Sequence, residues 1–184
     1  MPHKENQRIA LTRRLLQEGL LRLLAHEKLE HISVTALCKE AGINRATFYN
    51  HYASPTALLE EMEVSLVTRL QQITEHAESI EEILNQTEEC LILLKENSAL
   101  FQMLVKYHAD RDLEELVLKT AKYYDEHRLN VLQTKLDPDT VHLVSSYLYS
   151  GCYHLIREWL VRGIDKTPRE IAELLVSIVS KDYL

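Results

Sequence analysis

The chain has 184 residues, with 21 Lys and Arg against 28 Asp and Glu, and a formal net charge of −7. Its 46% apolar and 27% charged residues are globular proportions that exclude wholesale disorder. Three Cys exclude a disulfide framework, and we expect neither export nor a membrane span but a cytoplasmic protein. Taken over the whole chain, the acidic balance argues against a nucleic-acid partner, since phosphate binding needs a basic surface.

Helical periodicity runs through the chain. Only four Gly and four Pro interrupt it, and no segment alternates apolar and polar residues over the length of a strand. The sequence therefore predicts an all-α fold with about nine helices. In chain order they span residues 5–26, 33–41, 44–50, 54–76, 80–96, 98–107, 112–136, 137–161 and 167 onward.

Several predicted helices begin with a recognisable cap. Ser33 precedes the second helix, and Ser54 with Pro55 opens the fourth, where a hydroxyl accepts from a free amide and the Pro suits the first turn. Thr167 and Glu170 have the spacing of a capping box at the start of the last helix.

Charge is divided unevenly along the chain. Residues 1–58 hold eight Lys and Arg and five acidic residues, a balance of +3. Residues 59–184 hold thirteen basic and twenty-three acidic residues, a balance of −10. The asymmetry predicts a basic module joined to an acidic body, which removes the whole-chain objection to a nucleic-acid partner.

The segment 33–51, SVTALCKEAGINRATFYNH, has the residue pattern of a helix-turn-helix. Such a motif needs a small residue at the close approach, a glycine in the turn and buried apolar residues on both sides. Those residues are Cys38, Gly42, Leu37, Ile43 and Phe48. The second helix then presents hydrogen-bonding side chains suited to base edges and phosphates in a major groove. They are Asn44, Arg45, Thr47, Asn50 and His51.

The longer stretch 32–62, ISVTALCKEAGINRATFYNHYASPTALLEEM, resembles the N-terminal signature of the TetR/AcrR family of transcriptional regulators. The resemblance implies a helix-turn-helix DNA-binding domain over residues 1–62 and a helical ligand-binding and dimerisation domain over residues 63–184. It further implies a homodimer on a palindromic double-stranded DNA operator, acting as a repressor that a small-molecule effector releases. An adaptor or effector sensor of the same fold, acting through a protein partner without operator binding, is the alternative.

Carried over to this sequence, the resemblance assigns DNA contacts to particular residues. They are Ser33, Thr35, Asn44, Arg45, Thr47, Tyr49, Asn50, His51 and Ser54. Arg45 would read a base, whereas Tyr49 and His51 would bind phosphate; taken singly, Tyr49 also fits a core aromatic and His51 a surface histidine. Pro55 stands where the family usually has a phosphate-binding Lys, so we expect a modest affinity and a shallow dependence on salt.

The last two helices are the expected dimer interface, arranged as a four-helix bundle. Their apolar stripes are Val141, Val144, Leu148, Leu155, Ile156 and Trp159 on one helix, and Ile171, Leu174, Leu175, Ile178 and Val179 on the other. Residues 149–175 also resemble the C-terminal region of regulators of the dihydroxyacetone-kinase type. Gly151 would permit close helix approach across the dimer.

Side chains with polar tips on apolar bodies are candidates for an effector pocket among the body helices. They are Tyr107, His108, Tyr123, Tyr124, His127, Tyr147, Cys152 and His154, each of which also fits ordinary helix packing. No cofactor or metal is predicted, although His108 with His127, or His142 with a partner, leaves a metal site open. Without a phosphate-binding loop, a nucleophile elbow or a paired acid and base, no enzyme is predicted.

Overall fold

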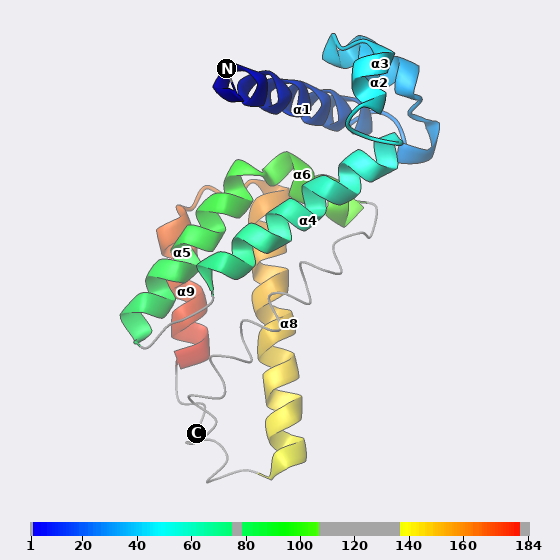
Figure 1. Ribbon diagram of the computed structural model, residues 1–184. Helices are drawn as coiled ribbons and strands as arrows, with labels where there is room; N and C mark the ends of the chain where they lie inside the picture. Colours follow the sequence, from blue (N-terminus) through cyan, green and yellow to red (C-terminus); the bar gives the residue numbers. More distant parts are fainter. Residues whose placement is uncertain (1, 75–78, 107–136, 181–184) are drawn as a thin grey trace. The chain divides into compact units, whose positions relative to one another are not determined.

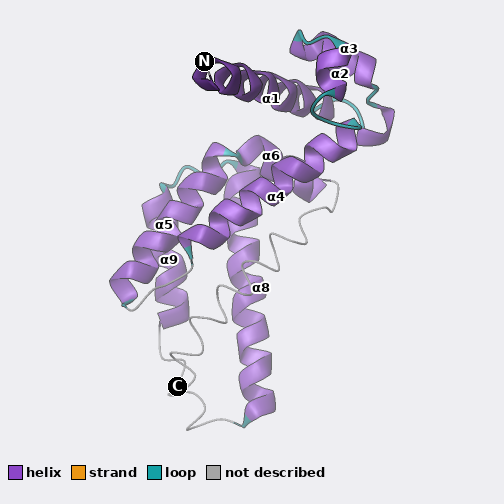
Figure 2. Ribbon diagram, in the orientation of Figure 1, coloured by secondary structure: helices purple, strands orange, loops and turns teal. Residues whose placement is uncertain are grey.

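The computed structural model describes residues 2–74, 79–106 and 137–180. Within them it has eight α-helices, one short 3-10 helix and no strand, which confirms the all-α prediction (Figure 2). The chain divides into an N-terminal unit, residues 1–66, and a C-terminal unit, residues 67–184. This division and the predicted domain boundary after residue 62 both fall within one helix, α4 (Pro55–Ile73).

The N-terminal unit is built on one long helix. α1 (Pro2–Leu24) packs against α2 (Val34–Ala41), which contacts α3 (Arg45–Tyr49), and the 3-10 helix Leu29–His31 joins α1 to α2. Side chains from all four α-helices of the unit form its core. Its fully buried members are Leu16, Leu20, Leu24, Leu37, Phe48 and Leu58. Each such side chain contributes about 1.5–3 kcal/mol of burial free energy, so the core fixes where α3 sits.

The close helix approach in this unit lies between α1 and α2. A Cβ atom added to Gly19 would lie 3.2 Å from the Cβ of Ala41, tighter than ordinary van der Waals contact. Cys38, which the sequence pattern proposed for the close approach, is buried in the same core. Gly19 lies on α1, outside the helix-turn-helix segment, so this approach is separate from the one predicted at Cys38 between the two helices of the motif.

The C-terminal unit contains α5 (Ile80–Glu96), α6 (Ser98–Lys106), α8 (Pro138–Arg162) and α9 (Pro168–Ser180). α9 runs alongside α5, and α8 contacts both α6 and α9 (Figure 1). The apolar residues between these helices are buried and include Leu91, Phe101, Leu104, Trp159, Leu160 and Ala172. The predicted helix at residues 112–136 lies outside the described residues.

Caps define the ends of these helices, largely as predicted. The carboxylate of Asp137 accepts from the Thr140 amide at 3.1 Å at the start of α8, and Gly163 ends it with φ 60°. At α9 the capping box is complete: the Thr167 amide donates to Glu170 Oε2 at 2.8 Å, and the Glu170 amide donates to Thr167 Oγ1 at 3.2 Å. The Thr167 amide first, and then the Thr167 hydroxyl, which donates to Glu170 Oε2 at 2.9 Å, lower the pKa of the Glu170 carboxyl, because both donors favour the ionised form.

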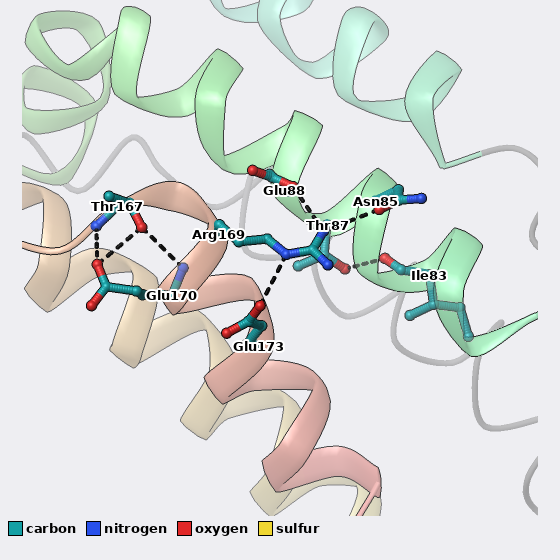
Figure 3. A network of polar contacts seen from close by, with 8 residues as sticks. All are labelled: Ile83, Asn85, Thr87, Glu88, Thr167, Arg169, Glu170 and Glu173. Carbon is teal, nitrogen blue, oxygen red and sulfur yellow. Dashed lines mark hydrogen bonds and ion pairs between the residues drawn. The ribbon is translucent and has the colours of Figure 1, made fainter.

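Arg169, the second residue of α9, joins this helix to α5 (Figure 3). Its Nη1 donates to Glu88 Oε2 at 2.9 Å and to Asn85 Oδ1 at 3.1 Å, while its Nε donates to Glu173 Oε1 at 3.0 Å. The guanidinium thus holds two residues of α5 and one of its own helix. This polar clamp lies beside the apolar contact between α5 and α9.

Five of the eleven residues of the predicted dimer stripes are buried within the single chain. Val141, Ile156 and Trp159 of α8 are buried, and so are Ile171 and Leu175 of α9. The other stripe residues with described side chains are less buried, and Leu174 is 40% exposed, so the interface through the last two helices stays a prediction. The face of α8 that stays open carries Leu143 and Tyr147, with 68% and 79% of their surface exposed.

Among the described helices, none has both the length and the apolar character needed to cross a membrane.

Candidate nucleic-acid interface

The first helix of the motif, α2, is capped at both ends. Ser33 precedes it, and its Oγ accepts from the Ala36 amide at 3.1 Å. Gly42 follows it with φ 67°, a left-handed conformation that glycine adopts without steric cost. The Ile43 amide then donates to the Cys38 carbonyl at 2.9 Å, which closes the turn. Both caps match the sequence prediction, and together they set the direction in which the chain enters α3.

The second helix of the motif, α3, has five residues and begins at Arg45. Asn44 is its N-cap, and Asn44 Oδ1 accepts from the Thr47 amide at 2.7 Å. A helix this short does not persist on its own, so α3 depends on tertiary packing. Phe48 supplies that packing: it is fully buried, and its ring meets Tyr49 edge-on at 5.6 Å and Tyr52 at 6.0 Å.

The predicted DNA-contacting residues form a continuous set on and around these two helices. Six of them are exposed on α2, on α3 or at the ends of these helices, whereas Thr47, His51 and Ser54 are half-buried. The exposed six are Ser33, Thr35, Asn44, Arg45, Tyr49 and Asn50. The Asn44 cap bond was not part of the sequence prediction, and it leaves the amide nitrogen of Asn44 as the group that can donate to DNA.

Ion pairing decides which cations of the basic module are available to phosphate. Most of its arginines are held by carboxylates of the same unit. The pairs are Arg13 with Glu61, Arg14 with Glu18 and Arg22 with Glu40, and Lys28 lies by Glu30. Among the described side chains, Arg8, Lys39 and Arg45 are exposed and form no ion pair. The sequence pattern did not distinguish Arg8 and Lys39, because they stand out only once the other cations are seen to be paired.

The start of α4 offers a hydroxyl in place of a cation. Ser54 Oγ accepts from the Ala57 amide at 3.1 Å, so its own hydrogen stays available to donate. Pro55, which occupies the position of the family's usual Lys, is buried. The start of α4 therefore lacks the positive charge that a Lys would provide. A phosphate contact here would be a hydrogen bond from the uncharged Ser54 hydroxyl.

The predicted effector residues fall in two groups. Tyr107, His108, Tyr123, Tyr124 and His127 lie outside the described residues. Of the other three, Tyr147 and His154 are exposed and seven residues apart, hence on one face of α8, whereas Cys152 is buried on another face. Burial raises the pKa of the Cys152 thiol to about 11. The described residues do not bring the three together, and the effector pocket stays a prediction.

No metal-binding cluster is found in the part of the chain that the structure describes. There, no three side chains of His, Cys, Asp or Glu come close enough together to hold an ion.

Two family models match this chain. Residues 16–62 match the one described as bacterial regulatory proteins, tetR family, and residues 81–181 match a transcriptional regulator C-terminal region. The second match alone spans more than half of the chain. The first includes both helices of the motif and the start of α4.

Individual relatives agree with these matches. The uncharacterized HTH-type transcriptional regulator YxbF of Bacillus subtilis (strain 168) is 32% identical over 110 residues, which cover 58% of this chain and 28% of that protein. The match therefore spans less than a third of that relative.

Solved structures extend the likeness to the whole fold. The dihydroxyacetone kinase operon activator DhaS is 17% identical, with a TM-score of 0.57 over 91% of this chain and 93% of that one. A TetR-family transcriptional regulator from Bordetella parapertussis 12822 is 13% identical, with a TM-score of 0.65 over 93% and 95%. At these identities the similarity concerns the fold alone.

Proposed function

The chain belongs to the TetR family of DNA-binding transcriptional regulators, and we propose that it acts as a homodimer that represses transcription from a palindromic operator. In this proposal α3 enters the major groove, and Arg45 at its first position reads a base edge. Thr35, Asn44 and Thr47 lie near base edges, whereas Ser33, Tyr49, His51 and Ser54 contact the sugar–phosphate backbone.

The observation that carries the proposal is the state of Arg45. It is exposed at the N-terminus of a helix that Phe48 pins to the core, and it forms no ion pair among the described side chains. An arginine kept free of carboxylates, at the first position of an anchored helix, is suited to bidentate contact with a guanine. The uncompensated cations Arg8 and Lys39 supply attraction for phosphate in the same unit.

A second copy of the chain is the partner we assign to the open face of α8. Leu143 and Tyr147 are exposed there, and a Cβ added to Gly151 would meet nothing within 4 Å. Apolar side chains beside a glycine, which has no side chain to hold a second helix away, suit a symmetric helix–helix contact. In such a contact the same residues of both subunits meet. Dimerisation places two recognition helices about 34 Å apart, the spacing of successive major grooves.

Repression and its release follow the family pattern. A dimer that covers a promoter excludes other proteins from the same duplex. An effector bound in the C-terminal unit would shift the population toward dimers whose recognition helices do not fit both half-sites. α4 belongs to both units and is the helix through which such a shift reaches α3.

Selection of bound sequences from a random duplex pool tests the proposal. We expect recovery of a palindrome whose half-site centres are about 10 base pairs apart, with affinity that falls as salt rises. Transcription in vitro from a promoter carrying the recovered site should then fall when the protein is added. A pool without enrichment would instead favour the adaptor function, and a rise in transcription would contradict repression.

A further inference from the structure

Three elements of the N-terminal unit meet at the carboxylate of Glu61. Glu61 lies two turns into α4, and its Oε1 accepts a hydrogen bond from the Tyr52 hydroxyl at 3.1 Å. The same oxygen lies 3.6 Å from Nη1 of Arg13 on α1. All three residues belong to the N-terminal unit, so the cluster is complete within it. No DNA contact is assigned to any of them, and neither the helix-turn-helix motif nor its caps require them.

Tyr52 ties this cluster to the recognition helix. It follows the last residue of α3 by three positions, and its amide donates to the Phe48 carbonyl at 2.9 Å. The ring is 4% exposed and packs against Phe48, so its hydroxyl has little freedom to move. Burial first, and then the charge of Glu61, raise the pKa of Tyr52 to about 12, which keeps the hydroxyl a donor at neutral pH.

The hydrogen bond from Tyr52 constrains the orientation of α3, which apolar contact alone does not. The Phe48 side chain fixes how deeply α3 is seated, but hydrophobic burial is non-directional and permits a helix to turn on its neighbour. The bond from Tyr52 to Glu61 has a required angle as well as a length, and it joins the end of α3 to α4. α4 then continues past residue 66 into the C-terminal unit.

We propose that Glu61 is a positioning residue, which sets the orientation of α3 on α4 through Tyr52 and Arg13 and thereby sets operator affinity without touching DNA. This inference rests on the proposed operator binding. Because base recognition tolerates little misplacement of the reading groups, a small rotation of α3 lowers affinity even in a fully folded protein.

Glu61→Gln tests the proposal, and Glu18→Gln is its matched control. Each substitution neutralises a glutamate that forms an ion pair with an arginine of the N-terminal unit. Glu18, however, pairs with Arg14 four residues away on the same helix, so its ion pair does not connect two elements. Loss of either negative charge strengthens the attraction of the unit for DNA phosphates by a similar amount. The difference in operator affinity between the two variants therefore measures the effect of Glu61 on the position of α3. Tyr52→Phe is the second variant, since it keeps the ring and removes the bond.

The measurements are operator affinity against salt concentration, with thermal unfolding to confirm that each variant is folded at the assay temperature. We expect Glu61→Gln to bind about three- to tenfold more weakly than Glu18→Gln, and Tyr52→Phe to bind more weakly than the wild type by a similar factor. The slope of log affinity against log salt should be the same for both glutamine variants, because no phosphate contact is lost.

A glutamine at position 61 can still accept from the Tyr52 hydroxyl, so Glu61→Gln removes the ion pair with Arg13 and the charge on the acceptor, whereas Tyr52→Phe removes the hydrogen bond itself. Because both changes act on one cluster, the Tyr52→Phe, Glu61→Gln double variant should lose less affinity than the sum of the two single losses. Equal affinity of Glu61→Gln and Glu18→Gln overturns the inference alone, as does a lowered melting temperature with unchanged affinity. Absence of any sequence-selective binding by the wild type overturns the proposed function as well.

Discussion

The two units of the molecule use their polar side chains in opposite ways. In the N-terminal unit the polar groups of α3 and its ends face solvent, and Arg8, Lys39 and Arg45 stay free of carboxylates among the described residues. In the C-terminal unit the guanidinium of Arg169 bonds helices to one another, while the exposed face of α8 carries the large apolar side chains of Leu143 and Tyr147. The first surface suits a polyanion, and the second suits a copy of itself.

The strongest test of this division deletes one buried ring from each unit. Phe48→Ala should lower the free energy of unfolding of the N-terminal unit by about 3–5 kcal/mol and abolish operator binding, because α3 loses its anchor. We expect the variant to remain dimeric by size-exclusion chromatography. Phe101→Ala, the matched deletion in the C-terminal unit, should instead weaken the dimer. A monomeric Phe48→Ala protein would contradict the separation of roles.

A charge on the open face of α8 should break the dimer. Leu143→Glu places an unpaired carboxylate in the proposed contact and should raise the dimer dissociation constant about a hundredfold. Ile80→Glu is the control, because Ile80 is 63% exposed on α5, outside that face. Analytical ultracentrifugation would compare the two, and equal dissociation constants would remove α8 from the interface.

Removal of Arg45, the arginine proposed to read a base, should affect DNA binding alone. Arg45→Ala should weaken binding to the selected operator by about 1–3 kcal/mol and leave the dimer intact. Lys28→Ala removes a charge from the same unit, but Lys28 lies by Glu30 and should matter much less. Electrophoretic shifts at fixed salt measure both. Equal operator affinity of the two variants would show that Arg45 reads no base.

The smallest expected effect concerns acid and the capping box of α9. The folded protein holds the pKa of Glu170 below its ordinary value of 4.5, chiefly through the Thr167 amide. The cap therefore stabilises α9 above pH 4.5, and the stabilisation is lost as the pH falls through the lower pKa of the folded state. Glu170→Gln should melt a few degrees lower at pH 7 and depend less on pH below 4.5. The exposed Glu96→Gln is the control, and identical melting profiles would contradict the prediction.

The parts of the structure that were predictable are those decided by near neighbours in the chain. The helices are capped by Ser33, Gly42 and Thr167 through hydrogen bonds to residues three to five positions away. The types and spacing of these residues therefore predict the helix ends. Arg45 was found in the same way, because its place follows from the turn before it. The cap bond of Asn44 is equally local and was missed only because its side chain was assigned to DNA.

What the sequence did not disclose depends on distant partners. Arg169 meets Asn85 and Glu88 across more than 80 positions, and Gly19 meets Ala41 across two helices. The apolar stripe of α8 was assigned to the dimer because periodicity marks an apolar face without telling whether the same chain or another covers it. For the same reason the free cations became visible only after Arg13, Arg14 and Arg22 had been paired.

The state of the cysteines makes the proposed α8 contact accessible to chemical cross-linking. Burial raises the pKa of Cys38, brings that of Cys90 to about 12 with help from the charge of Glu89, and brings that of Cys152 to about 11. Because the thiolate is the reactive form, all three native thiols react slowly with oxidants and alkylating reagents at neutral pH. A thiol introduced by Tyr147→Cys, on an exposed site, is then the fast-reacting group of the molecule. Cross-linking between copies at that position would test the symmetry of the proposed dimer without removal of any native cysteine.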